Sequence, residues 1–259
     1  MPTLNEIDNV LSAVAPANLS ESWDNDGIML CSNADVSVNK VLVSLDVNLD
    51  VINFAENNNF DLILSHHPLF FKPFSRIVGD EYALIEKLIK AKISVLSYHT
   101  RMDSSEQGVN VCLAQLLDLQ NVRGFGGESG NIGRIGELKN PMKPTEFAQF
   151  LKDKFACGTI RASGVESDDK IIKTCALVGG AGKSFLYDVV MAGADAFVTS
   201  EASHNTFIDA KTNNICLFDC GHYYTENPVC FKFKQLLEEY FGNKLYVEIF
   251  DVKSPYINI

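Results

Sequence analysis

The sequence predicts an α/β protein, because short apolar runs typical of strands alternate along the chain with longer segments of helical periodicity. The 259 residues suit one large domain or two smaller ones, and the apolar fraction of 46% is ordinary for a protein with a sizeable core. Three of the strand-like runs are followed by histidines at or shortly after their carboxyl ends, although the chain has only five histidines in all.

The predicted helices follow from apolar residues spaced three or four positions apart. In the first, Leu4, Ile7, Leu11 and Val14 share a face, and Pro16 ends the helix. The predicted helices are residues 4–14, 49–55, 81–91, 108–119, 144–154, 185–192, 203–212 and 226–241.

The predicted strands are shorter apolar runs bounded by turn residues. They are residues 41–45, 62–65, 93–98, 132–138, 159–162, 171–178, 196–199, 215–218 and 245–250. The glycine-rich segment 124–130 is the candidate domain boundary. Segment 21–27 contains Trp23, Asp24, Asn25, Asp26 and Gly27. A turn is favoured there, because Asx residues are frequent in loops, although Asp24 or Asp26 could instead lie near a functional site.

Adjacent histidines follow the strand predicted at residues 62–65, and Pro68 comes directly after them. Along a regular strand, neighbouring side chains point to opposite faces, so His66 and His67 can serve one site only if the chain leaves the strand there. Proline favours an extended conformation for the residue before it and has no backbone donor for a continuing ladder. The motif therefore predicts a strand end that presents two fixed imidazoles.

Two other strands end in the same way, and each histidine is followed four residues later by a carboxylate. These pairs are His99 with Asp103 and His222 with Glu226. Together with the adjacent histidines they provide enough imidazoles and carboxylates for two metal ions. Mixed donors of this kind suit zinc, manganese or iron. Two metals that share a carboxylate can bind a water between them, lower its pKa and support hydrolysis.

Charge and composition exclude several function classes. The net charge is −11 and no basic cluster stands out, which argues against nucleic acid or an anionic membrane as a partner. The seven cysteines are odd in number and form no Cys-x-x-Cys pair, so neither a disulfide framework nor a thiolate zinc site is expected. We see no secretory signal and no apolar stretch long enough for a bilayer, so we expect a cytoplasmic location.

Two further motifs carry less weight. Residues 179–184 are rich in glycine, but a P-loop needs a glycine where Leu177 stands. The segment could still present backbone amides to an anion, although a tight turn from strand to helix is favoured. No Gly-x-Ser-x-Gly motif occurs, so a serine nucleophile is set aside.

The motifs resemble those of a known family along nearly the whole chain. The matching stretches are Trp23-Asp24-Asn25 with Gly27, Ser65-His66-His67-Pro68-Leu69, His99-Thr100 with Asp103 and Gly108-Val109-Asn110, and Gly221-His222-Tyr223 with Thr225-Glu226. They are similar to the dinuclear-metal-centre hexamer family, also called the Nif-three-like family, whose members carry the name GTP cyclohydrolase 1 type 2. The chain resembles the short form of that family.

The resemblance implies two interleaved α/β domains with helices packed on mixed sheets. It assigns residues 1–127 with about 216–259 to a discontinuous metal-binding domain, and residues 128–215 to a second domain. It also implies a toroidal homohexamer with two divalent metal ions per chain. The implied metal ligands are His66, His67, Asp103, His222 and Glu226, with Glu226 as the bridge.

The same resemblance implies that His99 sits beside the metal site, where it could transfer protons. Glu201 and His204 are further candidates for catalytic assistance, although His204 lies in a helical stretch and a structural role is favoured for it. One departure is visible: the family usually has Thr-Gly-Asp or Thr-Gly-Glu where this chain has Thr199-Ser200-Glu201. A side chain thus replaces glycine near the place where a substrate would approach.

The leading functional hypothesis is a hydrolase that depends on two metals and uses a metal-bound water as nucleophile. The family name implies ring opening of GTP with release of formate, while the residues alone support only hydrolysis assisted by two metals. A nucleotide or another phosphoester is the substrate to be tested. The alternative is a hexameric metal-binding scaffold or regulatory protein without catalysis, which would need the same ligands.

Overall fold

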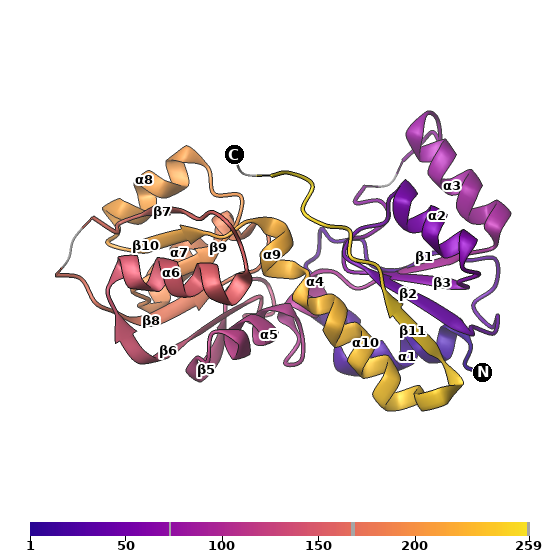
Figure 1. The fold of residues 1–259 in the computed structure, drawn as a ribbon, viewed down its shortest axis with the longest axis horizontal. Helices are drawn as coiled ribbons and strands as arrows, with labels where there is room; N and C mark the ends of the chain where they lie inside the picture. Colours follow the sequence, from indigo (N-terminus) through magenta and orange to yellow (C-terminus); the bar gives the residue numbers. More distant parts are fainter. Residues whose placement is uncertain (73, 167–168, 258–259) are drawn as a thin grey trace. The chain divides into compact units, whose positions relative to one another are not determined.

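The structure, a computed structural model, describes residues 1–72, 74–166 and 169–257. It confirms the α/β class, with helices alternating with the strands of two mixed sheets (Figure 1). The chain divides into two compact units. Unit 1 comprises Met1–Met102 and Val229–Lys253, and unit 2 comprises Asp103–Pro228 and the residues from Ser254 onward.

Unit 1 is built on a five-stranded sheet in the order β1-β4-β3-β2-β11. Its strands are β1 (Gly27–Leu30), β2 (Lys40–Ser44), β3 (Leu62–Ser65), β4 (Ser94–Ser97) and β11 (Tyr246–Ile249). Four of them run parallel, and β1 joins β4 antiparallel at the edge. In this register Val43 lies opposite Leu64, which lies opposite Leu96. The carboxyl ends of β2, β3 and β4 therefore lie side by side at one edge of the sheet.

Helices cover both faces of the unit 1 sheet (Figure 1). They are α1 (Leu4–Val14), α2 (Leu49–Asn57), α3 (Asp80–Ala91) and α10 (Pro228–Phe241). On one face α2 and α3 pack on the strands, with Ile52, Leu88 and Ile63 in one buried cluster. Local capping fixes where helices begin: the Thr3 side chain accepts from the Glu6 amide, and Glu6 accepts from the Thr3 amide in return.

Unit 2 is built on a six-stranded sheet in the order β5-β6-β8-β9-β10-β7. Its strands are β5 (Gln120–Phe125), β6 (Gly133–Met142), β7 (Arg161–Ser163), β8 (Ile172–Leu177), β9 (Ala196–Thr199) and β10 (Cys216–Asp219). The central strands β8, β9 and β10 run parallel, while β6 and β7 join them antiparallel. The parallel strands again bring their carboxyl ends to one edge.

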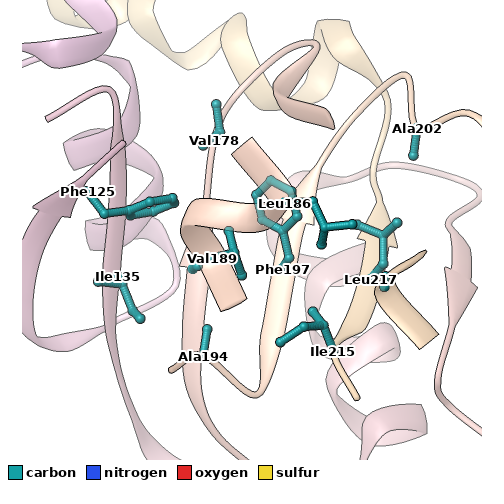
Figure 2. Packing of buried hydrophobic residues seen from close by; sticks show 12 residues of the cluster. Phe125, Ile135, Val178, Leu186, Val189, Ala194, Phe197, Ala202, Ile215 and Leu217 are labelled. Atoms are coloured by element: carbon teal, nitrogen blue, oxygen red, sulfur yellow. The ribbon is translucent and has the colours of Figure 1, made fainter. Parts of the chain in front are cut away.

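The helices of unit 2 pack on both faces of its sheet. They are α5 (Val109–Leu116), α6 (Pro144–Phe155), α7 (Leu186–Ala192), α8 (His204–Thr212) and the short α9 (His222–Glu226). Figure 2 shows the core under α7, where Leu186 and Val189 pack against Phe197 and Leu217 of the strands. On the other face Phe147 of α6 meets Phe218 edge to face, with ring centroids 5.2 Å apart.

Within the described residues the predicted elements are present with shifts at their ends, and, short 3₁₀-helices aside, two strands and two α-helices escape the sequence prediction. These are β1, β5, α4 (Thr100–Ser104) and α9. Two of them are helices of five residues, too short to show a helical repeat. Strand β1 exists through its pairing with β4, with Gly27 opposite Ser97, and such long-range pairing leaves no local signal.

The two compact units differ in their bounds from the predicted domains. Strand β10 pairs with β9 and β7 and so belongs to unit 2, and the short helix α9 that follows it lies in unit 2 as well. The division into two domains, residues 1–127 with about 216–259 and residues 128–215, stays a prediction. In the part of the chain that the structure describes, every helix is too short or too polar to cross a membrane.

Candidate metal centre

Three histidines gather at the carboxyl edge of the unit 1 sheet. His66 and His67 follow β3, and His99 follows the neighbouring parallel strand β4. Their ligand atoms lie within 4.8 Å of one another, and the rings of His66 and His99 have centroids 5.2 Å apart. The structure thus places these imidazoles just after the ends of two neighbouring strands, and it brings the adjacent histidines close together where the chain leaves β3.

Each of the two adjacent imidazoles is held through its Nδ1 atom. Nδ1 of His66 lies 2.9 Å from the backbone carbonyl oxygen of Tyr98, and Nδ1 of His67 lies 2.7 Å from Oδ1 of Asp46. A carbonyl and an ionised carboxylate only accept hydrogen bonds, so Nδ1 carries the proton in both rings. The lone pair is then on Nε2, which is the arrangement that metal-binding histidines commonly use.

His99 is held in the same way by Asp24. Its Nδ1 lies 2.8 Å from Oδ1 of Asp24, whose other oxygen accepts from the Thr100 amide at 2.9 Å. Burial alone would raise the pKa of Asp24, but the hydrogen bonds from His99 and Thr100 and the charge of His99 outweigh burial and hold that pKa well below its ordinary value. Asp24 therefore stays ionised and fixes the orientation of the His99 ring.

A second donor group lies in unit 2, around Glu226. His222 and Glu226 stand four residues apart on α9 and so share a helix face, with Nε2 of His222 2.6 Å from Oε2 of Glu226. Nδ1 of His222 lies 2.7 Å from Oε1 of Glu201, so each nitrogen of this ring faces a carboxylate oxygen, and Nε2 offers its lone pair to a metal only when it carries no proton. An oxygen of Asp103, on α4, lies within 4.8 Å of one of Glu226.

The glycine-rich turn after β8 leaves room for these donors. Gly180 has φ +63°, and a β-carbon there would lie 1.8 Å from Oε1 of Glu226 and 3.2 Å from Nε2 of His222. The Gly180 amide donates to Oγ1 of Thr225, one residue before Glu226, at 3.0 Å. The favoured interpretation as a tight turn is consistent with this geometry, and the turn also shapes the space beside the carboxylate, a role that the sequence did not indicate.

Asn110 and Arg134 fix the backbone near Asp103. The Asn110 amide nitrogen donates to the carbonyls of Ile132 at 2.6 Å and Asp103 at 3.4 Å, and its oxygen accepts from the Gly179 amide at 2.7 Å. Arg134 is 1% exposed and donates to the carbonyls of Ser104 and Ser105, each at 3.0 Å. One buried amide thus ties the Asp103 segment to the glycine turn beside Glu226.

Each unit therefore brings part of the predicted set together. Unit 1 groups His66, His67 and His99, and unit 2 groups Asp103, His222 and Glu226 with Glu201 behind His222. His204 begins α8 with an exposed side chain, and no hydrogen bond within the described ranges joins it to the other candidates.

Sequence reasoning missed the residues that hold the candidate ligands. Asp46 directly follows the strand predicted at residues 41–45 and was not among the candidates. The turn interpretation was favoured for Asp24, which does lie in a turn segment but also holds His99. Its position in the sequence could have pointed to Asp46, because Asp46 follows β2, and His66 follows β3, the parallel neighbour of β2.

The donor set fits a borderline divalent metal. Neutral imidazoles with a proton on Nδ1, combined with carboxylates, are ligands that zinc, manganese and iron accept in proteins. Carboxylates and a backbone carbonyl on the far side of each ring are the arrangement that fixes and strengthens such ligands. The geometry within each unit therefore agrees with the chemistry of a metal site.

Comparisons with known proteins agree with the resemblance drawn from the motifs. A model of the Duf34/NIF3 (NGG1p interacting factor 3) family matches residues 2–255. A protein of Clostridium perfringens named GTP cyclohydrolase 1 type 2 homolog is 32% identical over 243 residues, which cover 91% of each chain. A protein of the same name from Clostridium acetobutylicum is 31% identical over 232 residues, covering 87% of this chain and 85% of its own.

Solved structures show the same fold. A hypothetical protein of Staphylococcus aureus superposes with a TM-score of 0.89 at 27% identity, covering 100% of both chains. Reduced HcgD from Methanocaldococcus jannaschii superposes with a TM-score of 0.84 at 27% identity, covering 97% of this chain and 98% of that one. Because the family model spans nearly the whole sequence and relatives above 30% identity cover most of it, the chain belongs to the Duf34/NIF3 family.

Proposed function

We propose that the protein is a hydrolase that uses two divalent metal ions per chain. The proposed ligands are His66 and His67 of unit 1 and Asp103, His222 and Glu226 of unit 2. The observation that carries the proposal is the common state of four histidines, each with Nδ1 bound to an oxygen acceptor. Histidines with a merely structural role have no reason to share this one orientation.

The residues of the chain have separate tasks in this proposal. Asp46 and Glu201 hold the rings of His67 and His222 and keep the proton on Nδ1. Gly180 has no side chain and so leaves space for the carboxylate of Glu226, the proposed bridge. Two bound divalent ions would act as Lewis acids and generate a nucleophile from water at neutral pH. His99, oriented by Asp24, would accept or return a proton during the reaction.

The substrate class is proposed from the family name. The relatives named GTP cyclohydrolase 1 type 2 homolog suggest a nucleotide, with ring opening and release of formate as the specific reaction. Ser200 stands where the family usually has glycine, and its hydroxyl donates to the carbonyl of Gly180 beside Glu226. The Ser200 side chain therefore bonds to the glycine turn.

We also propose a homohexamer in the cytoplasm, on the strength of the family resemblance. Apolar side chains that favour self-association are present: Tyr187 and Met191, four residues apart on α7, are 73% and 69% exposed. Light scattering should give six times the mass of one chain, 28.6 kDa, whereas a monomer would refute the hexamer.

Elemental analysis tests the metal site, on wild type and on the double variant His67→Ala/Asp103→Ala. We expect about two metal ions per chain in the wild type and their loss in the variant, while His204→Ala keeps its metal. Protein that binds no metal, even after reconstitution, would overturn the proposal.

A screen of nucleotides and phosphoesters on the metal-loaded protein then tests catalysis. His222→Ala should abolish turnover without unfolding the chain, and full activity in that variant would contradict the assigned role. The alternative is a non-catalytic metal-binding ring, since metal binding alone requires no substrate. Metal binding without turnover of any substrate would favour that alternative.

A further inference from the structure

Two aromatic side chains beside the unit 1 histidines are exposed. Trp23 is 60% exposed and Phe71 is 49% exposed. Their ring centroids lie 6.1 Å and 5.3 Å from that of His99, with interplanar angles of 73° and 86°. Large aromatic rings are usually buried, because burial removes much apolar surface from water. Two of them left exposed beside a histidine cluster indicate a surface that binds something.

The backbone that carries these rings is anchored. The side-chain nitrogen Nδ2 of Asn25 donates to the backbone carbonyl of Phe70 at 2.6 Å, which ties the segment of Trp23 to the segment of Phe71. Asp24 is bonded to Thr100 and His99 directly after Trp23. Phe71 also lies near His67, with centroids 6.5 Å apart. Both rings are therefore held beside the imidazoles before any ligand arrives, which reduces the entropy lost on binding.

The chemistry of this surface favours a planar aromatic ligand. Exposed aromatic faces bind either organic cations or other flat rings. Divalent ions on the neighbouring histidines would repel a cationic ligand, but they would attract one that carries phosphate. A flat heteroaromatic ring stacks on Trp or Phe whatever its hydrogen-bonding edge, and such stacking is a strong contribution to the binding of nucleobases.

We propose that Trp23 and Phe71 form the surface on which this protein binds a planar heteroaromatic ring, such as a nucleobase, beside its histidine cluster. This role rests on the proposed function, since it gives the substrate class of the same site. It makes the two side chains binding residues, separate from the residues that hold metal. The ring of the ligand, rather than its phosphate, is what they recognise.

The chain contains a single tryptophan, so its fluorescence reports on Trp23 alone. The test titrates full-length, zinc-loaded protein with GMP, AMP and UMP, and in parallel with ribose 5-phosphate and choline, following tryptophan emission with correction for absorbed light. We expect saturable quenching by at least one of the nucleotides. Ribose 5-phosphate, which has the phosphate but no base, and choline, which is a cation, should leave the emission unchanged.

Variants separate stacking from other effects. Phe71→Ala should raise the Kd of the quenching nucleotide at least about fivefold, as expected for loss of one stacking side chain. Phe71→Tyr keeps a ring and should restore binding. The matched control is Phe231→Ala, because Phe231 is 65% exposed on α10 of the same unit. Calorimetric titration of Trp23→Ala and of Trp23→Phe with the same nucleotide makes the same comparison of Kd at Trp23, the residue whose fluorescence reports binding in the other variants.

Four results would overturn this role. Two concern the ligands: no nucleotide binds, or ribose 5-phosphate binds as tightly as the nucleotides. The other two concern the protein: Phe71→Ala binds nucleotide as tightly as the wild type, or the emission spectrum without ligand is that of a buried tryptophan, which would mean that another subunit covers Trp23. Nucleotide binding without turnover would refute only the hydrolase proposal. Turnover of a substrate without an aromatic ring, combined with no nucleotide binding, would refute only the role of Trp23 and Phe71.

Discussion

A β-carbon on Gly180 would lie 1.8 Å from Oε1 of Glu226. The glycine turn after β8 and the carboxylate on α9 therefore depend on each other, although 46 positions separate them in the sequence (226 − 180). Since Glu226 also lies 2.6 Å from Nε2 of His222, any residue that displaces this carboxylate disturbs both donors. This relationship leads to the first prediction.

Gly180→Ala should lose metal, because the new methyl group occupies the place of the Glu226 carboxylate. Gly193→Ala is the matched control, since Gly193 also has positive φ, +77°, but a β-carbon added there would meet no atom within 4 Å. Both variants should lose about 1–2 kcal/mol of unfolding free energy from backbone strain. Only Gly180→Ala should show reduced metal by elemental analysis, and equal metal content in the two variants would disprove the steric role.

Asp46→Ala should weaken zinc binding about 10- to 100-fold, because the carboxylate no longer holds Nδ1 of His67. Asp50→Ala removes an equivalent charge from the exposed first turn of α2 and should leave zinc affinity unchanged. Competition with a chromophoric chelator measures both affinities. An unchanged affinity in Asp46→Ala would show that the hydrogen bond to His67 does not support metal binding.

Glu201→Gly should separate metal binding from stability. Glu201 has φ +53°, a conformation that glycine adopts more readily, so the unfolding free energy of metal-free protein should change by less than about 1 kcal/mol. Metal affinity should fall, because Nδ1 of His222 loses its acceptor. Lys92→Gly makes the same backbone change at φ +57° at the end of α3 and should bind metal like the wild type. If Glu201→Gly does so too, Glu201 does not position His222.

Asn110→Ala should cost about 2–4 kcal/mol of unfolding free energy, because it leaves the Gly179 amide and the Ile132 carbonyl buried without their partner. Asn213→Ala removes an exposed amide at the end of α8 and should cost less than about 1 kcal/mol. Urea unfolding measures the difference. Equal losses would mean that the Asn110 bonds contribute no more than a surface contact.

The class of the fold and the chemistry of the donors could be predicted from local sequence patterns. Periodicity located most helices and strands, since the repeat of apolar residues reflects which side of each element is buried. The strand ends before His66, His99 and His222 could be predicted, because apolar runs followed by proline or polar residues are local features. The donor types themselves favoured a divalent metal, and the order of the motifs indicated the family.

What holds those donors became visible only in the folded chain. Asp24 reaches His99 across 75 positions of sequence, and Asn110 reaches Gly179 across 69. The pairing of β1 with β4 and the space that Gly180 leaves for Glu226 likewise depend on segments far apart in the chain. A local pattern records the preference of a residue for helix, strand or turn, but it holds no information on which distant side chain completes a hydrogen bond. For that reason the candidate ligands could be proposed from the sequence, while the residues that orient them emerged only from the fold.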